Sequence, residues 1–157
     1  MVDLEMADGK FGKVIAFRMK PGTDVQEGLL EACKRSDIKN GVIVSAIGSL
    51  DGAVFFDAVE RSDLKSGYGY GDPLTLVGPI ELTGASGIVC HDDTGEINLH
   101  VHLSMSDRYG NAHGGHLTEG TKVLLTVDVV IAEIRDLVMG RAFDPDLGGL
   151  VFAPRQS

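Results

Sequence analysis

The sequence contains little cysteine, which limits the kinds of scaffold it can form. Cys33 and Cys90 are its two cysteines, and they do not form a C-x-x-C pair. A chain that carries no secretory signal usually keeps its thiols reduced, and free cysteine is among the more buried residue types. We therefore expect two small apolar residues in the core.

Long apolar segments are also missing. No run approaches the ~18 residues that a membrane helix needs. Residues 1–13 are acidic and lack the apolar region of a secretory signal. These absences predict a cytoplasmic protein with no membrane partner.

Clustered positive charge is absent as well. The chain has 23 acidic and 14 basic residues, and its formal net charge is −9. Its densest basic stretch, KRSDIK, includes an aspartate. Because phosphate binding needs clustered Lys and Arg, the charge argues against a nucleic-acid partner.

Several common catalytic motifs are missing too. The chain contains no G-x-S-x-G nucleophile elbow, no P-loop and no H-E-x-x-H zinc motif. Its GYGYG segment lacks the strand-then-helix context of a dinucleotide fingerprint. Tyr68 and Tyr70 in that segment either line a cleft or cover apolar surface, including a subunit contact.

The hydrophobic pattern predicts one helix and seven or eight strands. Apolar residues recur at helical spacing from Val25 to Cys33, so we expect a helix over residues 24–35. Thr23 and Gln26 have the spacing of a capping box at its start. The predicted strands are residues 13–19, 41–50, 53–60, 96–106, 121–134 and 148–154, with two more inside 74–90. We expect a tight turn at Asp51-Gly52. Loops are expected at residues 62–73 and around His113 and His116.

This order of elements predicts the fold class. A chain of 157 residues is most simply one domain, residues 1–157. The strands do not alternate regularly with helices. We therefore expect an α+β fold with a mainly antiparallel sheet, curled into a sandwich or partial barrel, and one main helix.

The most informative segment is LHVHLSMSDRYGNAHGGHL, residues 99–117, which contains four of the five histidines. Side chains alternate between the two faces of a strand, so the apolar residues of 97–105 mark the core face. His100 and His102 then lie side by side on the other face, with Cβ atoms about 6–7 Å apart. Two imidazoles at that spacing can bind one metal ion.

A third ligand is available nearby. His116 follows Gly114-Gly115, and two glycines let a backbone bend sharply and approach closely, so a loop could return His116 over the pair. Three histidines with a fourth position left for water or substrate are typical of catalytic zinc. Imidazole also suits other divalent transition metals, so the pattern alone leaves the metal open.

Other polar residues have two interpretations each. Glu119 could be a fourth ligand, a partner of a ligand or a general base, and Arg18 could bind a substrate carboxylate or pair with a surface acid. Glu81 lies either on a solvent face or in a pocket. His113 could be a ligand, a base or a solvated loop residue, and His91 is expected at the surface.

The chain resembles the PPC domain family, the domain shared by plants and prokaryotes that accompanies AT-hooks in plants. The matching pieces run in order over about residues 13–134. They are FRMKPGTDVQEGLLEACKRSDIKNGVIVSAIGSLDGAVFFD, GPIELTGASGIV, INLHVHLSMSDRYGNAHGGHL and VLLTVDVVIAEI. The H-V-H and G-G-H-L pieces are the most specific.

The resemblance implies an α+β domain that assembles as a homotrimer. In prokaryotic members it implies a zinc site on the histidines that match His100, His102 and His116. Plant members contact partner proteins through the segment that matches GPIEL, but Pro79 and Ile80 depart from the pair typical there. The chain also has no R-G-R-P core of an AT-hook, so the family's association with DNA does not carry over.

Two functions remain open from the sequence. The first is a zinc-dependent lyase or hydrolase acting on a small oxo-acid, with Glu119 handling protons and Arg18 holding the acidic substrate. A more distant likeness, to acetolactate decarboxylase, is an analogy of fold and ligand pattern, and fold does not carry function. The second is a non-catalytic oligomeric binding or regulatory module whose metal is structural. DNA binding is a less favoured third.

Overall fold

The computed structural model describes residues 2–157, which form one helix and ten strands. The helix is α1 (Val25–Arg35). The strands are β1 (Lys10–Met19), β2 (Gly41–Phe56), β3 (Ala58–Glu60), β4 (Tyr68–Tyr70), β5 (Leu74–His91), β6 (Ile97–Asp107), β7 (Ala112–Leu117), β8 (Lys122–Arg135), β9 (Leu137–Asp144) and β10 (Gly149–Gln156).

Eight strands form a single curved sheet in the order β1-β8-β2-β7-β6-β5-β9-β10. Strand β2 also pairs with β5, so β2, β7, β6 and β5 close into a ring while β1 and β10 remain edges. The pairings are antiparallel except for a short parallel contact between β5 and β9. The predicted α+β fold with a mainly antiparallel, partly closed sheet is therefore confirmed.

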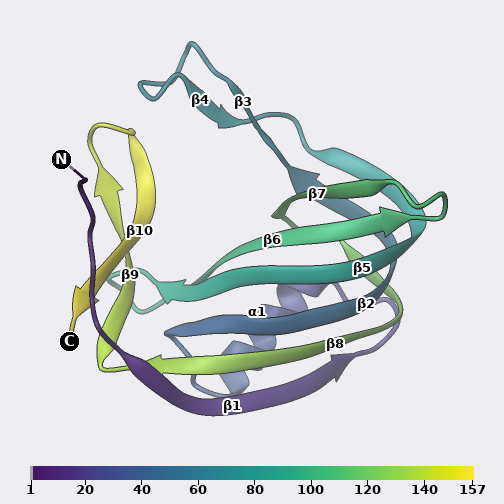
Figure 1. The fold of residues 1–157 in the computed structure, drawn as a ribbon, viewed down its shortest axis with the longest axis horizontal. Coiled ribbons are helices and arrows are strands. Elements are labelled where there is room, and N and C mark those ends of the chain that lie inside the picture. The colour runs from purple at the N-terminus through teal and green to yellow at the C-terminus, as the bar shows by residue number, and fades with distance from the viewer. Residues whose placement is uncertain (1) are drawn as a thin grey trace.

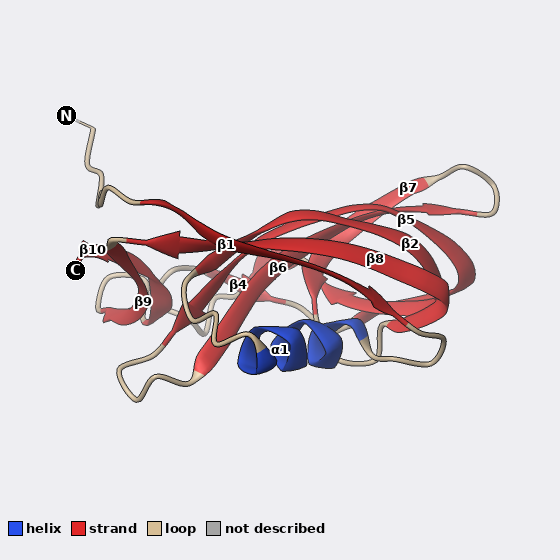
Figure 2. Ribbon diagram, turned by 90° about the horizontal axis from the view of Figure 1, so that it is seen from below, coloured by secondary structure: helices blue, strands red, loops and turns tan. Residues whose placement is uncertain are grey.

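Helix α1 covers one face of this sheet (Figure 2). Its buried residues are Val25, Leu29 and Cys33, spaced four apart so that they fall on one side of the helix. The cap differs from the prediction. The Asp24 carboxylate, not Thr23, accepts hydrogen bonds from the first backbone N–H groups of the helix.

The hydrophobic core lies between the sheet and the helix. It includes Leu50, Leu82, Val101, Val127 and Ile131, all at most 2% exposed. Both cysteines are buried and unpaired, as predicted.

Two pairs of predicted strands are in fact single long strands. Residues 41–50 and 53–60 were predicted as two strands joined by a tight turn, but β2 runs unbroken to Phe56. The pairing register shifts between Leu50 and Gly52, so the Asp51-Gly52 pair forms a bulge within the strand. Residues 74–90 likewise form one 18-residue strand, β5. The sheet curves strongly enough for long strands to wrap around the core.

Two segments expected as loops contain strands, and one strand was missed. Residues 62–73 include β4, which pairs with β3 in a small hairpin separate from the main sheet. The histidine-rich segment forms β7. Strand β9 had no predicted counterpart, and it pairs with the predicted C-terminal strand β10. Figure 1 shows the β3–β4 hairpin projecting from the curved sheet and the β9–β10 hairpin forming one end of it. Within residues 2–157, the one helix is not long and apolar enough to cross a membrane.

Candidate metal centre

Strand β6 presents two histidines on its outer face. Val101, Leu103 and Met105 are buried on the inner face, at most 3% exposed. His100 is half-buried and His102 is exposed on the opposite face. The alternation expected from the sequence is therefore present, and α1 packs on the other side of the sheet.

Strand β7 brings the third histidine to the same place. It runs antiparallel to β6, and His116 lies directly opposite His102. The neighbouring Leu117 points into the core, so His116 points outward. This differs from the expected mechanism, in which a flexible Gly-Gly bend would fold His116 back over the pair.

Gly114 and Gly115 allow the close backbone approach that was predicted for them, but within a strand and not at a sharp bend. A Cβ on Gly114 would lie 2.7 Å from the carbonyl oxygen of Leu103, and one on Gly115 would lie 2.5 Å from the ring of Phe55. Neither has a left-handed φ. The two glycines therefore allow β7 to pack closely between β6 and β2, and this close packing sets the position of His116.

The three imidazoles converge. Their ring centroids are 5.0, 5.2 and 5.4 Å apart, and the Nε2 atoms of His100 and His102 are 3.0 Å apart. One ring nitrogen from each histidine lies within 4.8 Å of the other two. Among residues 2–157, this is the one group of three or more metal-ligand side chains with such geometry.

The donor set fits a metal ion. Zinc bound to imidazole at ~2.0–2.1 Å in a tetrahedron places its ligand nitrogens about 3.3 Å apart, so small side-chain rotations would complete the shell. No carboxylate or thiolate joins the group. Three neutral imidazoles would leave one coordination position open, as in catalytic zinc sites, and would leave the metal's charge uncompensated.

Tyr70 holds the ring of His116. Its hydroxyl lies 2.9 Å from Nδ1 of His116, and its own ring stacks on Phe56 with centroids 5.6 Å apart. A ligating histidine usually donates its second ring N–H to a neighbouring group, which fixes the tautomer and the orientation. The Tyr70 contact leaves Nε2 of His116 as the free ligand atom.

The surroundings keep two of these rings neutral. Burial, together with the nearby charges of His100 and His102, lowers the pKa of His116 to about 4. Burial and the charge of His102 also lower the pKa of His100. Neutral imidazole is the form that binds metal, so both rings are ready for a ligand near neutral pH.

Arg141 on β9 adds a positive charge to the electrostatics of the histidines, and no motif in the sequence pointed to it. Its positive charge adds to the lowering of the pKa of His100 and of His116, after burial and the neighbouring histidines. It also opposes the burial that raises the pKa of Tyr70. Strand β9 follows β6 by some 30 residues of chain, so only the folded sheet could reveal this effect.

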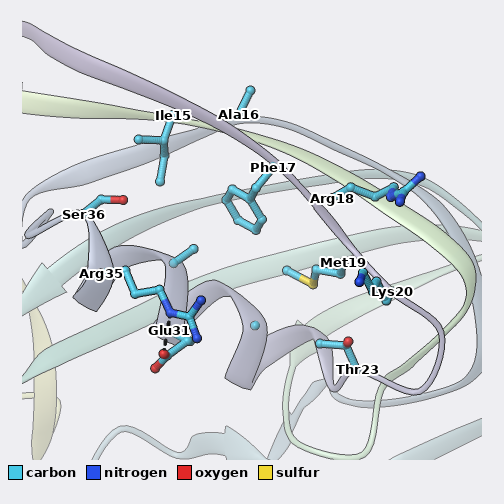
Figure 3. Close-up of a pocket in the computed structure, with 12 residues that line it drawn as sticks. Ile15, Ala16, Phe17, Arg18, Met19, Lys20, Thr23, Glu31, Arg35 and Ser36 are labelled. Carbon is cyan, nitrogen blue, oxygen red and sulfur yellow. Dashed lines mark hydrogen bonds and ion pairs between the residues drawn. The ribbon is translucent and has the colours of Figure 1, made fainter.

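The structure does not bring Arg18 or Glu119 to the histidines. Arg18 borders the groove of about 700 Å³ between β1 and α1 (Figure 3). Strand β1 is separated from β6 by four inter-strand spacings, about 19 Å along the sheet. Glu119 is exposed in the turn after β7, where the N–H of Gly120 donates to the Asp24 carboxylate at the start of α1.

The remaining candidates have other surroundings. His113 is half-buried, and its Nε2 lies 3.1 Å from the Asp107 carboxylate. Three residues separate it from His116, so the two project from opposite faces of β7. His91 is half-buried against the carbonyl of Lys39, and Glu81 is exposed on β5.

Comparison with known proteins places the chain in a family. Residues 6–135 match the model of the Plants and Prokaryotes Conserved (PCC) domain. The chain belongs to this family. Among curated proteins, it is 28% identical over 138 residues to the bifunctional protein GlmU of a Synechococcus strain. The match covers 88% of this chain but 20% of that protein, so the chain spans about a fifth of its curated relatives.

Solved structures share the fold. A metal-containing protein from Archaeoglobus fulgidus has a TM-score of 0.80 at 24% identity, covering 95% of this chain and 99% of that one. A plant- and prokaryote-conserved protein from Pyrococcus horikoshii has a TM-score of 0.77 at 23% identity, with 98% of each chain covered. The family resemblance seen in the sequence is confirmed.

Proposed function

We propose that the protein binds a divalent transition metal, zinc in the first instance, through His100, His102 and His116. The observation that carries this proposal is the convergence of three ring nitrogens within 4.8 Å on one outer face. The Tyr70 contact supports it, because a second-ring hydrogen bond is the usual partner of a ligating histidine. The structural neighbour from Archaeoglobus fulgidus is itself described as metal-containing.

The open coordination position suits chemistry on a small molecule. Bound zinc would supply Lewis acidity toward a carbonyl or toward water. A shallow hollow of about 240 Å³, lined by His100, His102 and residues 86–88, borders the site and has room for a small ligand. The proposed activity is that of a metal-dependent lyase or hydrolase on a small oxo-acid. The proposal gives no role to Arg18 or Glu119, because neither side chain lies at the three histidines.

A second candidate is a metal-stabilised oligomer, the homotrimer that the family resemblance implies. Residues paired across strands share a face, and one such row runs from β1 to β6. It consists of Val14, Ala132, Val42, Ile88 and His100. Within this row Val14 is 61% exposed and Ala132 is 3% exposed, and Val44 and Ile47, farther along β2, are 57% and 51% exposed. An apolar face that continues into the histidines favours a subunit contact beside the metal.

Cobalt(II) titration of metal-free protein tests the proposal. Tetrahedral or five-coordinate cobalt on three imidazoles gives visible absorption bands that saturate at one equivalent. His116→Ala should abolish this saturation, and His91→Ala should preserve it. Absence of bands in the native chain would contradict the proposal.

Sedimentation velocity separates the two candidates. A structural metal predicts that a chelator dissociates the oligomer, because the ion then supports the subunit contact. A metal reserved for ligand chemistry predicts an unchanged oligomer after the ion is removed.

A further inference from the structure

The free edge of β1 borders an apolar groove. Strand β1 pairs with β8 on one side, and its other edge is unpaired in the described part of the chain. Ile15, Phe17 and Met19 point from this strand toward α1 (Figure 3). On the helix side the groove is lined in part by Gly28 and Ala32, whose side chains are too small to cover them. A groove of about 700 Å³ therefore remains between strand and helix.

The rim of the groove is basic, although the chain as a whole is acidic. Arg18 and Lys20 line it, and neither forms an ion pair within residues 2–157. The Nε of Arg35 on α1 already pairs with the Glu31 carboxylate at 2.7 Å (Figure 3). The formal net charge of the chain is −9. Two unmatched cations beside an apolar groove favour an occupant that is both apolar and acidic.

The segment before β1 has this character. Residues 2–6, VDLEM, alternate between apolar and acidic side chains, which is the period of an extended strand. Val2, Leu4 and Met6 are 82%, 68% and 76% exposed, so they lack an apolar surface to pack on. Figure 2 shows this part of the chain leading away from the sheet before β1 begins. Three neighbouring exposed apolar side chains favour burial against another surface.

The segment and β1 have complementary patterns. The apolar residues of β1 that face the helix alternate with Ala16 and Arg18, which belong to the other face of the strand. A neighbouring strand that placed the apolar side chains of VDLEM over the helix would place Asp3 and Glu5 on the same face as Arg18. Opposite charges on paired strands stabilise the pairing. Extended segments commonly bind proteins by adding a strand to a free sheet edge.

A copy cannot seat its own segment in its own groove. The backbone of Asp8 is held by the side chain of Gln156 on β10, through two hydrogen bonds of 3.2 Å. Phe17, which lines the groove, comes nine residues after Asp8, about 30 Å along an extended strand. Leu4 comes four residues before Asp8 and can lie at most about 14 Å from it. The occupant therefore comes from another chain.

We infer that residues 2–6 of one copy add a strand to the free edge of β1 in a second copy, with Val2, Leu4 and Met6 in the groove. The contact is head-to-tail, because segment and groove are different surfaces, and repeated contacts of this kind can close a ring of copies. It uses the edge of the sheet, whereas the histidines lie on its outer face. The inference is therefore independent of the metal site.

Disulfide trapping in the Leu4→Cys/Ala32→Cys double variant tests the inference. Cys33 and Cys90 are buried, so the two introduced thiols are the ones available for mild oxidation. Copies should link into covalent dimers and larger species on a non-reducing gel, and peptide mass spectrometry should find residue 4 joined to residue 32. The matched control is Leu4→Cys/Ala142→Cys, because Ala142 is exposed on β9 and does not line the groove. This control should form no bridge between its two introduced thiols.

Each outcome decides the matter. A bridge from residue 4 to residue 32 between copies supports the inference. A bridge within one copy, which leaves the protein monomeric on the gel, would overturn it. No bridge, or one that forms equally well in the Ala142 control, would also overturn it and leave the groove to a different acidic partner. Circular dichroism checks the fold first, and if Ala32→Cys does not fold, Ser36→Cys takes its place in the same groove.

Charge reversal tests the expected pairing of the two strands. Arg18→Glu/Lys20→Glu, added to the trapping variant, sets like charges opposite Asp3 and Glu5, so the yield of the bridge should fall by about tenfold. Adding Asp3→Lys/Glu5→Lys to the same chain should restore the yield, because opposite charges then face each other again. A yield that stays unchanged on reversal would overturn the pairing, as would a loss that the second reversal does not restore.

Discussion

The two ends of the β6–β7 hairpin use histidine in different ways. At the turn, His113 pairs with Asp107, whose carboxylate also accepts hydrogen bonds from the backbone N–H groups of Tyr109 and Asn111. Farther along the strands, His102 and His116 face each other with His100 beside them, and no carboxylate of residues 2–157 belongs to their group. A histidine with a carboxylate partner is satisfied by its own turn. The three converging imidazoles have no such partner, and a shared metal ion would satisfy them.

Removing one facing histidine should have the largest effect. His116→Ala takes away one of three ligands, so zinc affinity should fall by more than the roughly 10–100-fold typical of losing an outer-shell partner. His113→Ala, three residues away on the other face of β7, should leave zinc affinity unchanged. Competition with a chromophoric chelator measures both. Equal losses of zinc affinity in His116→Ala and His113→Ala would contradict the different roles given to the two histidines.

The next largest effect is expected at Tyr70. Tyr70→Phe keeps the stacking on Phe56 but loses the hydrogen bond to His116, so zinc affinity should fall by about tenfold. The matched control is Tyr68→Phe, on the same strand but 62% exposed. The same chelator competition applies, and a loss shared by both variants would point to the hairpin as a whole.

A substitution at the β6–β7 turn should change the thermal stability of the protein and leave metal binding unchanged. His113→Ala removes a half-buried partner of Asp107, and this should lower the Tm of the metal-free protein by about 2–4 °C. Differential scanning calorimetry measures the change. An unchanged Tm together with weakened zinc binding in His113→Ala would show that His113 serves the metal site and not the stability of the turn.

The smallest effect is a pH dependence of the turn. Hydrogen bonds from Asn111 and His113 hold the pKa of Asp107 well below its usual range. A carboxyl with a lowered folded-state pKa adds its full stability above its unfolded pKa of about 3.9, and that stability is lost progressively as pH falls from there through the lowered folded-state pKa. Asp107→Asn should therefore lower Tm fully at pH 7, and the Tm difference from the native protein should narrow steadily as the pH is lowered below about 4. A Tm difference that does not shrink at pH 3 would contradict this account.

The sequence revealed the parts of the fold that depend on local patterns. The alternation along 97–105 predicted which face carries His100 and His102, and helical spacing predicted α1 to within one residue. Strand lengths were less predictable. The Asp51-Gly52 pair looks like a turn, yet it is a bulge, because pairing with β5 and β8 continues on both sides of it.

The site was predictable only in its ligands. H-x-H and G-G-H are visible in the sequence, but the reason for the glycines is not, since it lies in contacts with Leu103 and Phe55. Tyr70 reaches the site through the β3–β4 hairpin, whose placement depends on tertiary contacts. The sequence offered Arg18 and Glu119 because they lie near predicted elements, and the fold directs them elsewhere.

The most direct measurement is the metal content of untagged protein, determined by elemental analysis beside a His100→Ala/His102→Ala variant. The account predicts about one zinc or similar ion per native chain and none in the variant. A native chain that holds no metal even after reconstitution, or a variant that holds as much as the native chain, would contradict it.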